Sequence, residues 1–251
     1  MVLWAAAGCA RQSEASVGDA EIPAPAGSSI PVTSPAPTNT APSRDPKLIP
    51  VEEGTTLTAT PKGKVPGYDG PEGTVTQQVT DLYYDRSTKL PVIDQVPGWL
   101  RVRLAPKPNG STVWLRAADV EVGSTPWKIV INLTTTHLQL YEHGEQVLDA
   151  PVGVGADATP TATGEFFVTF MQPAPSSSYG PWVMVTSGHS NVIQVWEGFP
   201  DGILAIHGPV GAEGVIGNTG ARLSNGCIRM RLEDQKKLTE VQPGSPIWII
   251  A

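Results

Sequence analysis

Short runs in which apolar and polar residues alternate, each ended by proline or glycine, fill the chain from Val51 to its C terminus. Alternation with a period of two indicates strands with one buried face, and the prolines and glycines mark the turns between them. The chain holds 25 prolines and 26 glycines, which leaves little room for long helices. We therefore expect a mainly β protein.

Residues 10–50 differ in composition from the rest of the chain. They are rich in Pro, Ala, Ser and Thr, and no aromatic residue occurs between Trp4 and Tyr68. Such a segment buries too little apolar surface to offset the entropy cost of ordering it. Because its prolines favour extended conformations, we predict a disordered linker over residues 10–50.

Residues 51–123 carry the pattern of a small β module. Leu90–Val96 and Trp99–Ala105 alternate and are separated by a Pro-Gly turn, and Thr112–Val120 follows a second turn. Short strands with tight turns suggest a small barrel. The words PGWLRVRL and PNGSTVWLRAADV resemble a bacterial Src-homology-3-like domain. That resemblance implies wall binding or positioning, and a structural spacer without a ligand is the alternative.

Residues 126–251 continue the β pattern after a boundary around Gly123–Pro126. They are predicted to form a β-sandwich-like domain with minimal helix. One segment, Arg231–Glu240, is expected to be helical, with Leu232 and Leu238 on its buried side. Strands are expected at Lys128–Leu133, His137–His143, Gln146–Gly155, Gly164–Met171 and Ser245–Ala251.

Charge and cysteine usage exclude several classes of protein. The formal net charge is −7, and no block of Lys or Arg offers the basic surface that nucleic acid requires. No segment reaches the ~18 apolar residues of a transmembrane helix. The two cysteines, Cys9 and Cys227, lie in unrelated contexts, which does not fit a disulfide scaffold.

Cys9 ends a short apolar stretch, and the sequence AAGC resembles the lipobox of bacterial lipoproteins. The resemblance implies cleavage before Cys9 and a lipid on its sulfur, so residues 1–9 are predicted to be a signal-like segment and Cys9 the membrane anchor. No Lys or Arg precedes Cys9, which departs from a secretory signal and would fit a translation start further upstream. A plain cysteine after small residues is the alternative.

The stretch that carries candidate chemistry lies near the C-terminal end. Leu204–Ile206 is an apolar run that ends in His207, and Gly208 breaks it. An imidazole with a pKa near ~6.5 accepts a proton at neutral pH. Cys227 follows Gly226, whose conformational freedom would let backbone N–H groups converge on an oxyanion.

Cys227 needs a base to act as a nucleophile. A thiol pKa near ~8.5 leaves little thiolate at neutral pH, and a neighbouring imidazole supplies that base in other acyl-transfer enzymes. The glycine-rich loop between His207 and Cys227 would let the two come together. For such a pair taken alone, an inert cysteine and an unrelated histidine are the alternative.

The words HG and SNGCIRM resemble the active-site motif of the YkuD-type L,D-transpeptidases. GVGADATPTATGEFFV (153–168) and GPWVMVTSGHSNV (180–192) resemble further segments of that family, the second its lid-bearing region. The resemblance covers about half of the chain, roughly 127–250. It implies an enzyme that forms 3→3 cross-links between peptidoglycan stems through a cysteine thioester, requires no metal or cofactor, and is acylated by carbapenem-type β-lactams.

The resemblance also assigns roles to residues. Cys227 would be the nucleophile and His207 the general base and later the acid, with the Gly208 carbonyl orienting the ring. Arg229 would orient the cysteine loop or meet a peptide carboxylate, with a structural salt bridge as the alternative. Asn225 stands where many members carry a histidine, so a second imidazole has no counterpart here. Supporting and oxyanion roles fall to Ser224, Asn225 and Gly226, and Tyr179, Trp182 and His189 are candidates for the donor groove, with core or surface positions as the alternative.

Other functions remain open from the sequence. The same Cys/His pair would serve an L,D-carboxypeptidase that uses water as acceptor, and an inactive wall-binding protein is a third reading. Metal binding is not expected, because His137, His143 and His189 lack the spacing of known zinc sites. Because the substrate exists only outside the cytoplasmic membrane, we expect an exported protein at its outer face or in the wall, anchored by lipid on Cys9.

Overall fold

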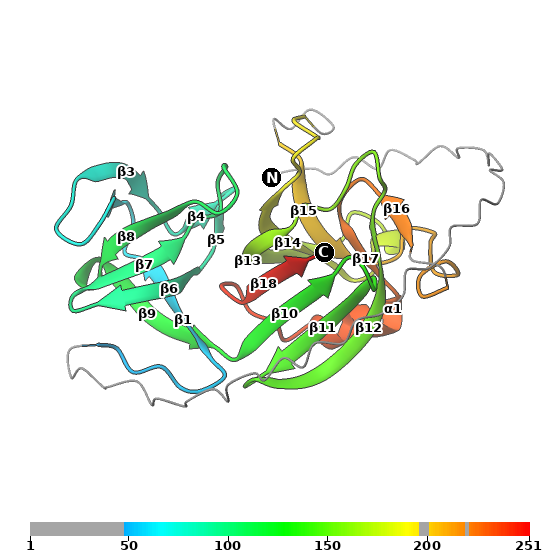
Figure 1. Cartoon of the computed structure of the whole chain (residues 1–251), viewed down its shortest axis with the longest axis horizontal. Coiled ribbons are helices and arrows are strands. Elements are labelled where there is room, and N and C mark those ends of the chain that lie inside the picture. The colour runs from blue at the N-terminus through cyan, green and yellow to red at the C-terminus, as the bar shows by residue number, and fades with distance from the viewer. Residues whose placement is uncertain (1–47, 196–200, 219–220) are drawn as a thin grey trace, which may run out of the picture.

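The computed structural model describes residues 48–195, 201–218 and 221–251. The predicted signal-like segment with Cys9, and nearly all of the predicted linker, lie outside these residues. The described part consists of two β-rich modules, shown side by side in Figure 1. The prediction of a mainly β protein is confirmed. No helix in the described ranges has the length and apolarity that a membrane span needs.

The N-terminal module is a seven-stranded sheet in the order β3-β2-β8-β7-β6-β1-β9, with a separate β4–β5 hairpin. Strand β9 pairs antiparallel with β1 from Thr56↔Thr125 to Pro61↔Val120. The module therefore extends to Thr125, slightly beyond the predicted end at residue 123. Its strands are β1 (Thr56–Pro61), β2 (Val65–Tyr68), β3 (Val75–Val79), β4 (Leu82–Tyr83), β5 (Arg86–Ser87), β6 (Leu90–Val96), β7 (Trp99–Arg103), β8 (Thr112–Arg116) and β9 (Val120–Thr125).

The C-terminal module is a nine-stranded sheet in the order β11-β10-β18-β13-β14-β15-β17-β12-β16. The long strand β12 also pairs with β11, which closes the sheet on itself. The helix predicted at Arg231–Glu240 is shorter: α1 (Leu232–Gln235) is continued by a 3₁₀ turn at Lys236–Leu238. Leu238 is buried as predicted, but Leu232 is exposed. The strands are β10 (Trp127–Asn132), β11 (His137–Glu142), β12 (Glu145–Gly155), β13 (Gly164–Pro173), β14 (Trp182–His189), β15 (Ile203–His207), β16 (Arg222–Ser224), β17 (Ile228–Met230) and β18 (Pro246–Ile250).

Strand β14 has no counterpart among the predicted strands. All eight of its residues are buried, because one face packs inside the closed sheet and the other is covered by the N-terminal module. A strand buried on both faces does not alternate between apolar and polar residues. Periodicity therefore gave no signal for this strand, which the family resemblance had treated as a lid-bearing region.

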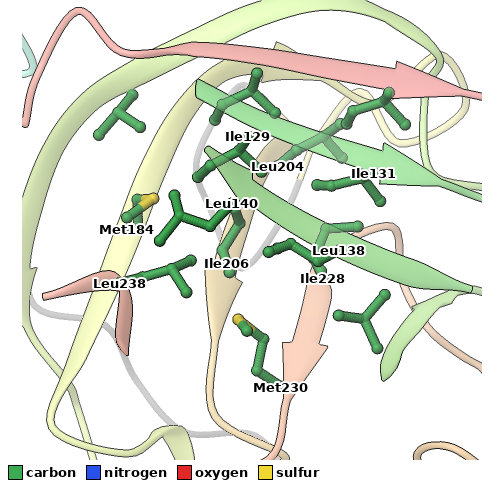
Figure 2. Packing of buried hydrophobic residues seen from close by; sticks show 14 of the residues in the cluster. Ile129, Ile131, Leu138, Leu140, Met184, Leu204, Ile206, Ile228, Met230 and Leu238 are labelled. Atoms are coloured by element: carbon green, nitrogen blue, oxygen red, sulfur yellow. The ribbon is translucent and has the colours of Figure 1, made fainter. Parts of the chain in front are cut away.

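The interior of the closed sheet is the first apolar core. Leu204 and Ile206 of β15 and Ile228 and Met230 of β17 point into it and are at most 2% exposed. Figure 2 shows them facing Leu140 and other side chains of β10 and β11. Since side chains alternate along a strand, the residues between them face outward. This inner packing fixes the two strands that carry the predicted catalytic pair.

A second apolar core joins the two modules. Leu100 and Val102 of the N-terminal module belong to the same buried cluster as Phe167, Val183 and Ala205 on the outer face of the closed sheet. Tyr83 and Phe170 also meet across this boundary, with ring centroids 6.5 Å apart. The outer face of β13, β14 and β15 is therefore covered by the N-terminal module.

Candidate active site

Strand pairing places His207 and Cys227 on adjacent strands, two positions apart in the register. Strands β15 and β17 are parallel partners, with Ile206 opposite Ile228 and His207 opposite Arg229. Cys227 directly precedes β17, so it lies diagonally from His207 on the adjacent strand. Adjacent strands are about 4.8 Å apart, and residues two positions apart share a face. Both side chains therefore lie on the outer face of this strand pair.

Cys227 sits at the edge of the core between the modules. It is half-buried and packs against the cluster that contains Ala205. Its Sγ atom lies 4.0 Å from the carbonyl oxygen of Ile203, the first residue of β15. The thiol is thus held against the same strand that carries His207 at its other end.

The His207 ring is held in one orientation. Its Nδ1 atom lies 2.8 Å from the carbonyl oxygen of Gly208, so Nδ1–H donates and Nε2 is left as the acceptor. The Tyr179 ring packs against the imidazole, with centroids 4.7 Å apart. His207 is only 5% exposed. The structure thus has the contact predicted for Gly208, and it places Tyr179 beside His207.

Burial is the main electrostatic influence on the imidazole. It lowers the pKa of His207 to about 4, with the Gly208 hydrogen bond opposing the shift and the nearby positive charge of Arg229 adding to it. His207 is therefore a neutral base at neutral pH. It can accept a proton there, which an imidazolium cannot do.

Burial has the opposite effect on the sulfur. It raises the pKa of Cys227, and contact with the Ala205 backbone and the charge of Arg229 only partly offset it. At neutral pH, burial therefore favours the protonated thiol of Cys227 and the neutral imidazole of His207. Nucleophilic attack by Cys227 therefore needs a base that takes the thiol proton.

The cysteine loop is closed by Ser224. The Ser224 hydroxyl donates to the Cys227 carbonyl oxygen at 2.5 Å and accepts from the Gly226 N–H at 3.1 Å. Gly226 has φ 113, a conformation that favours glycine. The predicted loop-supporting role of Ser224 and the special backbone of Gly226 are both present. The Gly226 N–H, however, is occupied by Ser224, so it does not serve as an oxyanion donor in this conformation.

Two threonines that were not singled out from the sequence hold this loop from the β12–β13 connection. Thr161 is 4% exposed; its hydroxyl donates to the Gly226 carbonyl oxygen at 2.8 Å and accepts from the Gly155 N–H at 2.9 Å. Thr159 donates to the Ser224 carbonyl oxygen at 3.2 Å and approaches Asn225 Oδ1 at 3.5 Å. The only signal was their place in TPTATG, a segment quoted for its resemblance alone.

Gly208 lies where a side chain has no room. A Cβ atom on it would be 2.6 Å from the Tyr179 carbonyl carbon. The Gly208 N–H donates to the Tyr179 carbonyl oxygen at 2.8 Å. Gln235 of α1 is fully buried and donates from Nε2 to the same oxygen at 3.1 Å and to the Trp182 carbonyl oxygen at 2.7 Å. The short helix thus positions the backbone that supports His207.

Arg229 lies opposite His207 in the strand register and is 9% exposed. Its charge lowers the pKa of both His207 and Cys227. A cation at this position disfavours the imidazolium and favours negative charge on sulfur or on a nearby oxygen. Its position opposite His207 fits a residue of this site, and its role in orienting the cysteine loop or binding a peptide carboxylate stays a prediction.

The structure does not bring Trp182 or His189 into this cluster. Trp182 is 8% exposed and packs in the interior core, with Nε1 donating to Thr239 at 3.4 Å. His189 is 1% exposed and contacts the N-terminal module through Ala105. Both candidate groove residues are therefore reassigned, one to core packing and the other to the boundary between modules, because strand β14 is buried on both faces.

Comparison with known proteins concerns the C-terminal half. Residues 126–249 match the family model of the YkuD-type L,D-transpeptidase catalytic domain. Over 119 residues the chain is 29% identical to the YkuD protein of Bacillus licheniformis and 26% identical to that of Bacillus subtilis, both provisionally named L,D-transpeptidases. Each match covers 47% of this chain, and the chain spans only 61% and 62% of those relatives. These matches support an L,D-transpeptidase catalytic domain in this half.

Solved L,D-transpeptidases are similar to this chain at low identity. The enzyme from Mycobacterium smegmatis is 15% identical, with a TM-score of 0.39 over 61% of this chain and 91% of its own. The catalytic domain from E. faecium is 22% identical, with a TM-score of 0.35 over 49% and 96%. L,D-transpeptidase 3 from Mycobacterium tuberculosis, solved with a faropenem-derived adduct, is 17% identical, with a TM-score of 0.41 over 57% and 69%.

Proposed function

We propose that this chain is a cysteine-dependent L,D-transpeptidase that forms 3→3 cross-links between the peptide stems of peptidoglycan. The observation that carries the proposal is the placement of His207 and Cys227 on one face of adjacent strands. The family match over residues 126–249 supports the same conclusion. The substrate would be a tetrapeptide stem, attacked at the carbonyl between an L-centre and the terminal D-residue.

In the first half-reaction, Cys227 attacks this carbonyl. His207 Nε2 takes the thiol proton as the carbon–sulfur bond forms, and it then delivers that proton to the nitrogen of the leaving D-residue. The peptide bond breaks, and a thioester remains on Cys227.

In the second half-reaction, an amine from a neighbouring stem attacks the thioester. His207 accepts a proton from that amine and returns it to the departing sulfur, which restores the thiol. The charge of Arg229 and the backbone N–H of Cys227 would stabilise the oxyanion in both steps. Ser224 and Thr161 hold the loop that positions this N–H.

The test is intact mass measurement after incubation with a carbapenem, together with a cross-linking assay on purified muropeptides. The unaltered protein should gain the mass of one inhibitor and produce 3→3 dimers, whereas Cys227→Ala should do neither. The alternative activity, L,D-carboxypeptidase, would release the terminal D-residue without dimers even when acceptor stems are present. Retained cross-linking by Cys227→Ala would overturn the proposal.

The location of the enzyme is part of the proposal. Peptidoglycan stems are cross-linked outside the cytoplasmic membrane, so the chain would act at its outer face or in the wall. A lipid on Cys9 would anchor it there. Mass measurement of protein extracted from membranes should show the lipid on Cys9, and an unmodified Cys9 would remove the anchor from the proposal.

A further inference from the structure

The connection between β14 and β15 is closed at its base. His189 is the last residue of β14, and Asp201 lies just before β15. Between them, the Ser190 N–H donates to the Gly202 carbonyl oxygen at 2.7 Å. The two ends of this connection are therefore held together, so a contact on either end acts on the start of β15.

The N-terminal module grips the His189 end with three polar contacts. His189 Nε2 lies 2.7 Å from the Ala105 carbonyl oxygen. Asn109 donates from Nδ2 to the His189 carbonyl oxygen at 2.8 Å and accepts from the His189 N–H through Oδ1 at 2.9 Å. Asn109 thus pairs with the backbone of β14 as a neighbouring strand would. The residues come from the segment between β7 and β8.

The segment between β7 and β8 also contacts the Asp201 end, through an ion pair. Lys107 Nζ lies 2.9 Å from Asp201 Oδ1, and His189 Nδ1 lies 2.8 Å from Asp201 Oδ2. Both His189 ring nitrogens therefore lie near oxygen atoms, Nε2 near the Ala105 carbonyl and Nδ1 near the Asp201 carboxylate. Charge-assisted contacts between partly buried groups are stronger than neutral ones. We call Lys107, Asn109, His189 and Asp201 the module latch.

The β4–β5 hairpin lies near enough to Asp201 of the latch to be affected by its charge. Burial raises the pKa of Tyr83 and of Tyr84, and the negative charge of Asp201 adds to both shifts. Tyr83 is also packed on Phe170. The Asp201 carboxylate thus pairs with Lys107 of the N-terminal module, and the β4–β5 hairpin of the same module lies near it.

The latch is connected to the thiol through two residues of backbone. Asp201 is followed by Gly202 and then by Ile203, whose carbonyl oxygen is the atom that Cys227 Sγ contacts at 4.0 Å. The other end of the same strand carries His207. Fixing Asp201 therefore fixes the end of β15 against which the thiol rests.

We infer that the N-terminal module is a working part of the catalytic unit, and that Asp201 and His189 are positioning residues through which Lys107 and Asn109 set the placement of Cys227. The inference builds on the proposed function, because it assigns these residues a task in the same reaction. It replaces the groove role that the sequence suggested for His189. It also gives the N-terminal module a task that needs no wall ligand.

Hydrogen exchange tests the latch without reference to activity. In the full chain, Asn109→Ala removes two hydrogen bonds to the His189 backbone, so exchange of backbone amides in residues 184–190 and 201–207 should become about tenfold faster. Ser111→Ala is the matched control, because Ser111 belongs to the same segment and its hydroxyl donates locally to the Pro108 carbonyl oxygen. Unchanged exchange in Asn109→Ala would overturn the latch.

Two reagents for Cys227 test the positioning role. Lys107→Met should slow acylation by a carbapenem about tenfold, whereas alkylation by iodoacetamide, which requires an accessible thiolate but no bound inhibitor geometry, should not slow. Lys107→Arg should restore acylation, and Lys64→Met, at an exposed lysine of the same module, should match the unaltered protein.

The possible outcomes separate this inference from the proposed function. If Lys107→Met and Asn109→Ala are acylated at the rate of the unaltered protein, the positioning role is wrong, even if hydrogen exchange shows that the latch contacts exist. If acylation by the carbapenem and alkylation by iodoacetamide slow equally, the substitutions have only reduced access to the Cys227 thiol, and the positioning role is again wrong. If the unaltered protein resists the carbapenem, the proposed function fails, while exchange still decides whether the latch exists.

Discussion

On the inner side of the β15–β17 strand pair lie Leu204, Ile206 and Ile228, whereas the outer side carries His207 and Cys227. The inner residues belong to the apolar core and are at most 2% exposed. The outer residues are also poorly exposed, but their burial shifts the pKa of the imidazole down and that of the thiol up. The same two strands therefore carry apolar core packing on one side and two titratable groups with shifted pKa values on the other.

This difference shows that burial has opposite consequences for apolar and for titratable side chains. For an apolar side chain, removal from water stabilises the fold in proportion to the area buried. For a titratable group, it disfavours the charged form and costs stability wherever that form is preferred in the unfolded chain. The outer side should thus control the rate and the pH dependence, and the inner side the unfolding free energy.

Replacing His207 on the outer side should give the largest effect. His207→Gln removes the general base, so carbapenem acylation of Cys227 should fall by roughly 10²–10⁴-fold, followed by mass spectrometry over time. His143→Gln, at an exposed histidine, is the control and should leave the rate unchanged. An unchanged rate in His207→Gln would mean that another group accepts the thiol proton.

Truncating a side chain on the inner side should act on stability instead. Ile206→Ala empties space in a fully buried cluster, so the unfolding free energy measured with urea should fall by about 2–5 kcal/mol. The control is Ile250→Ala on β18, where the side chain is 45% exposed and the loss should stay near ~0.5 kcal/mol. Equal losses in the two variants would contradict the assignment of Ile206 to the core.

Acid should expose the smallest of these differences. The unfolded chain protonates His207 near pH ~6.5, whereas the folded-state pKa is about 4. The contribution of His207 is therefore complete above the unfolded value and is lost as the pH falls through the folded value, by roughly 3 kcal/mol. His207→Gln should lose less stability than the unaltered protein over this range, as urea unfolding at several pH values would measure. Parallel curves would show that His207 is not buried as a neutral base.

Local patterns predicted much of the fold and the central pair. Alternation located β6, β7, β10, β11 and β12 to within a few residues, because burying one face of a strand requires apolar residues at every second position of the local sequence. A strand that ends in His207 and a glycine before Cys227 were likewise local signals. The structure adds the parallel pairing of β15 and β17, which no local pattern specifies.

Other parts of the site depend on segments that are distant in the chain. Thr161 holds the cysteine loop, and Gln235 holds the backbone beneath His207. Gln235 has no sequence context that marks it, and the only signal for Thr161 was its place in the TPTATG segment. Their roles arise only when the closed sheet brings these segments against the site.

The sequence by itself determined that the chain is mainly β, and it pointed to His207 and Cys227 as the candidate catalytic pair and to the C-terminal half as an L,D-transpeptidase domain. Only the tertiary structure decided that β14 is a doubly buried strand, that the Gly226 N–H is already bonded, and that His189 meets Ala105 of the other module. The reason is physical: strand periodicity and turns are encoded by adjacent residues, whereas burial on both faces and contacts between modules follow from how two whole sheets pack.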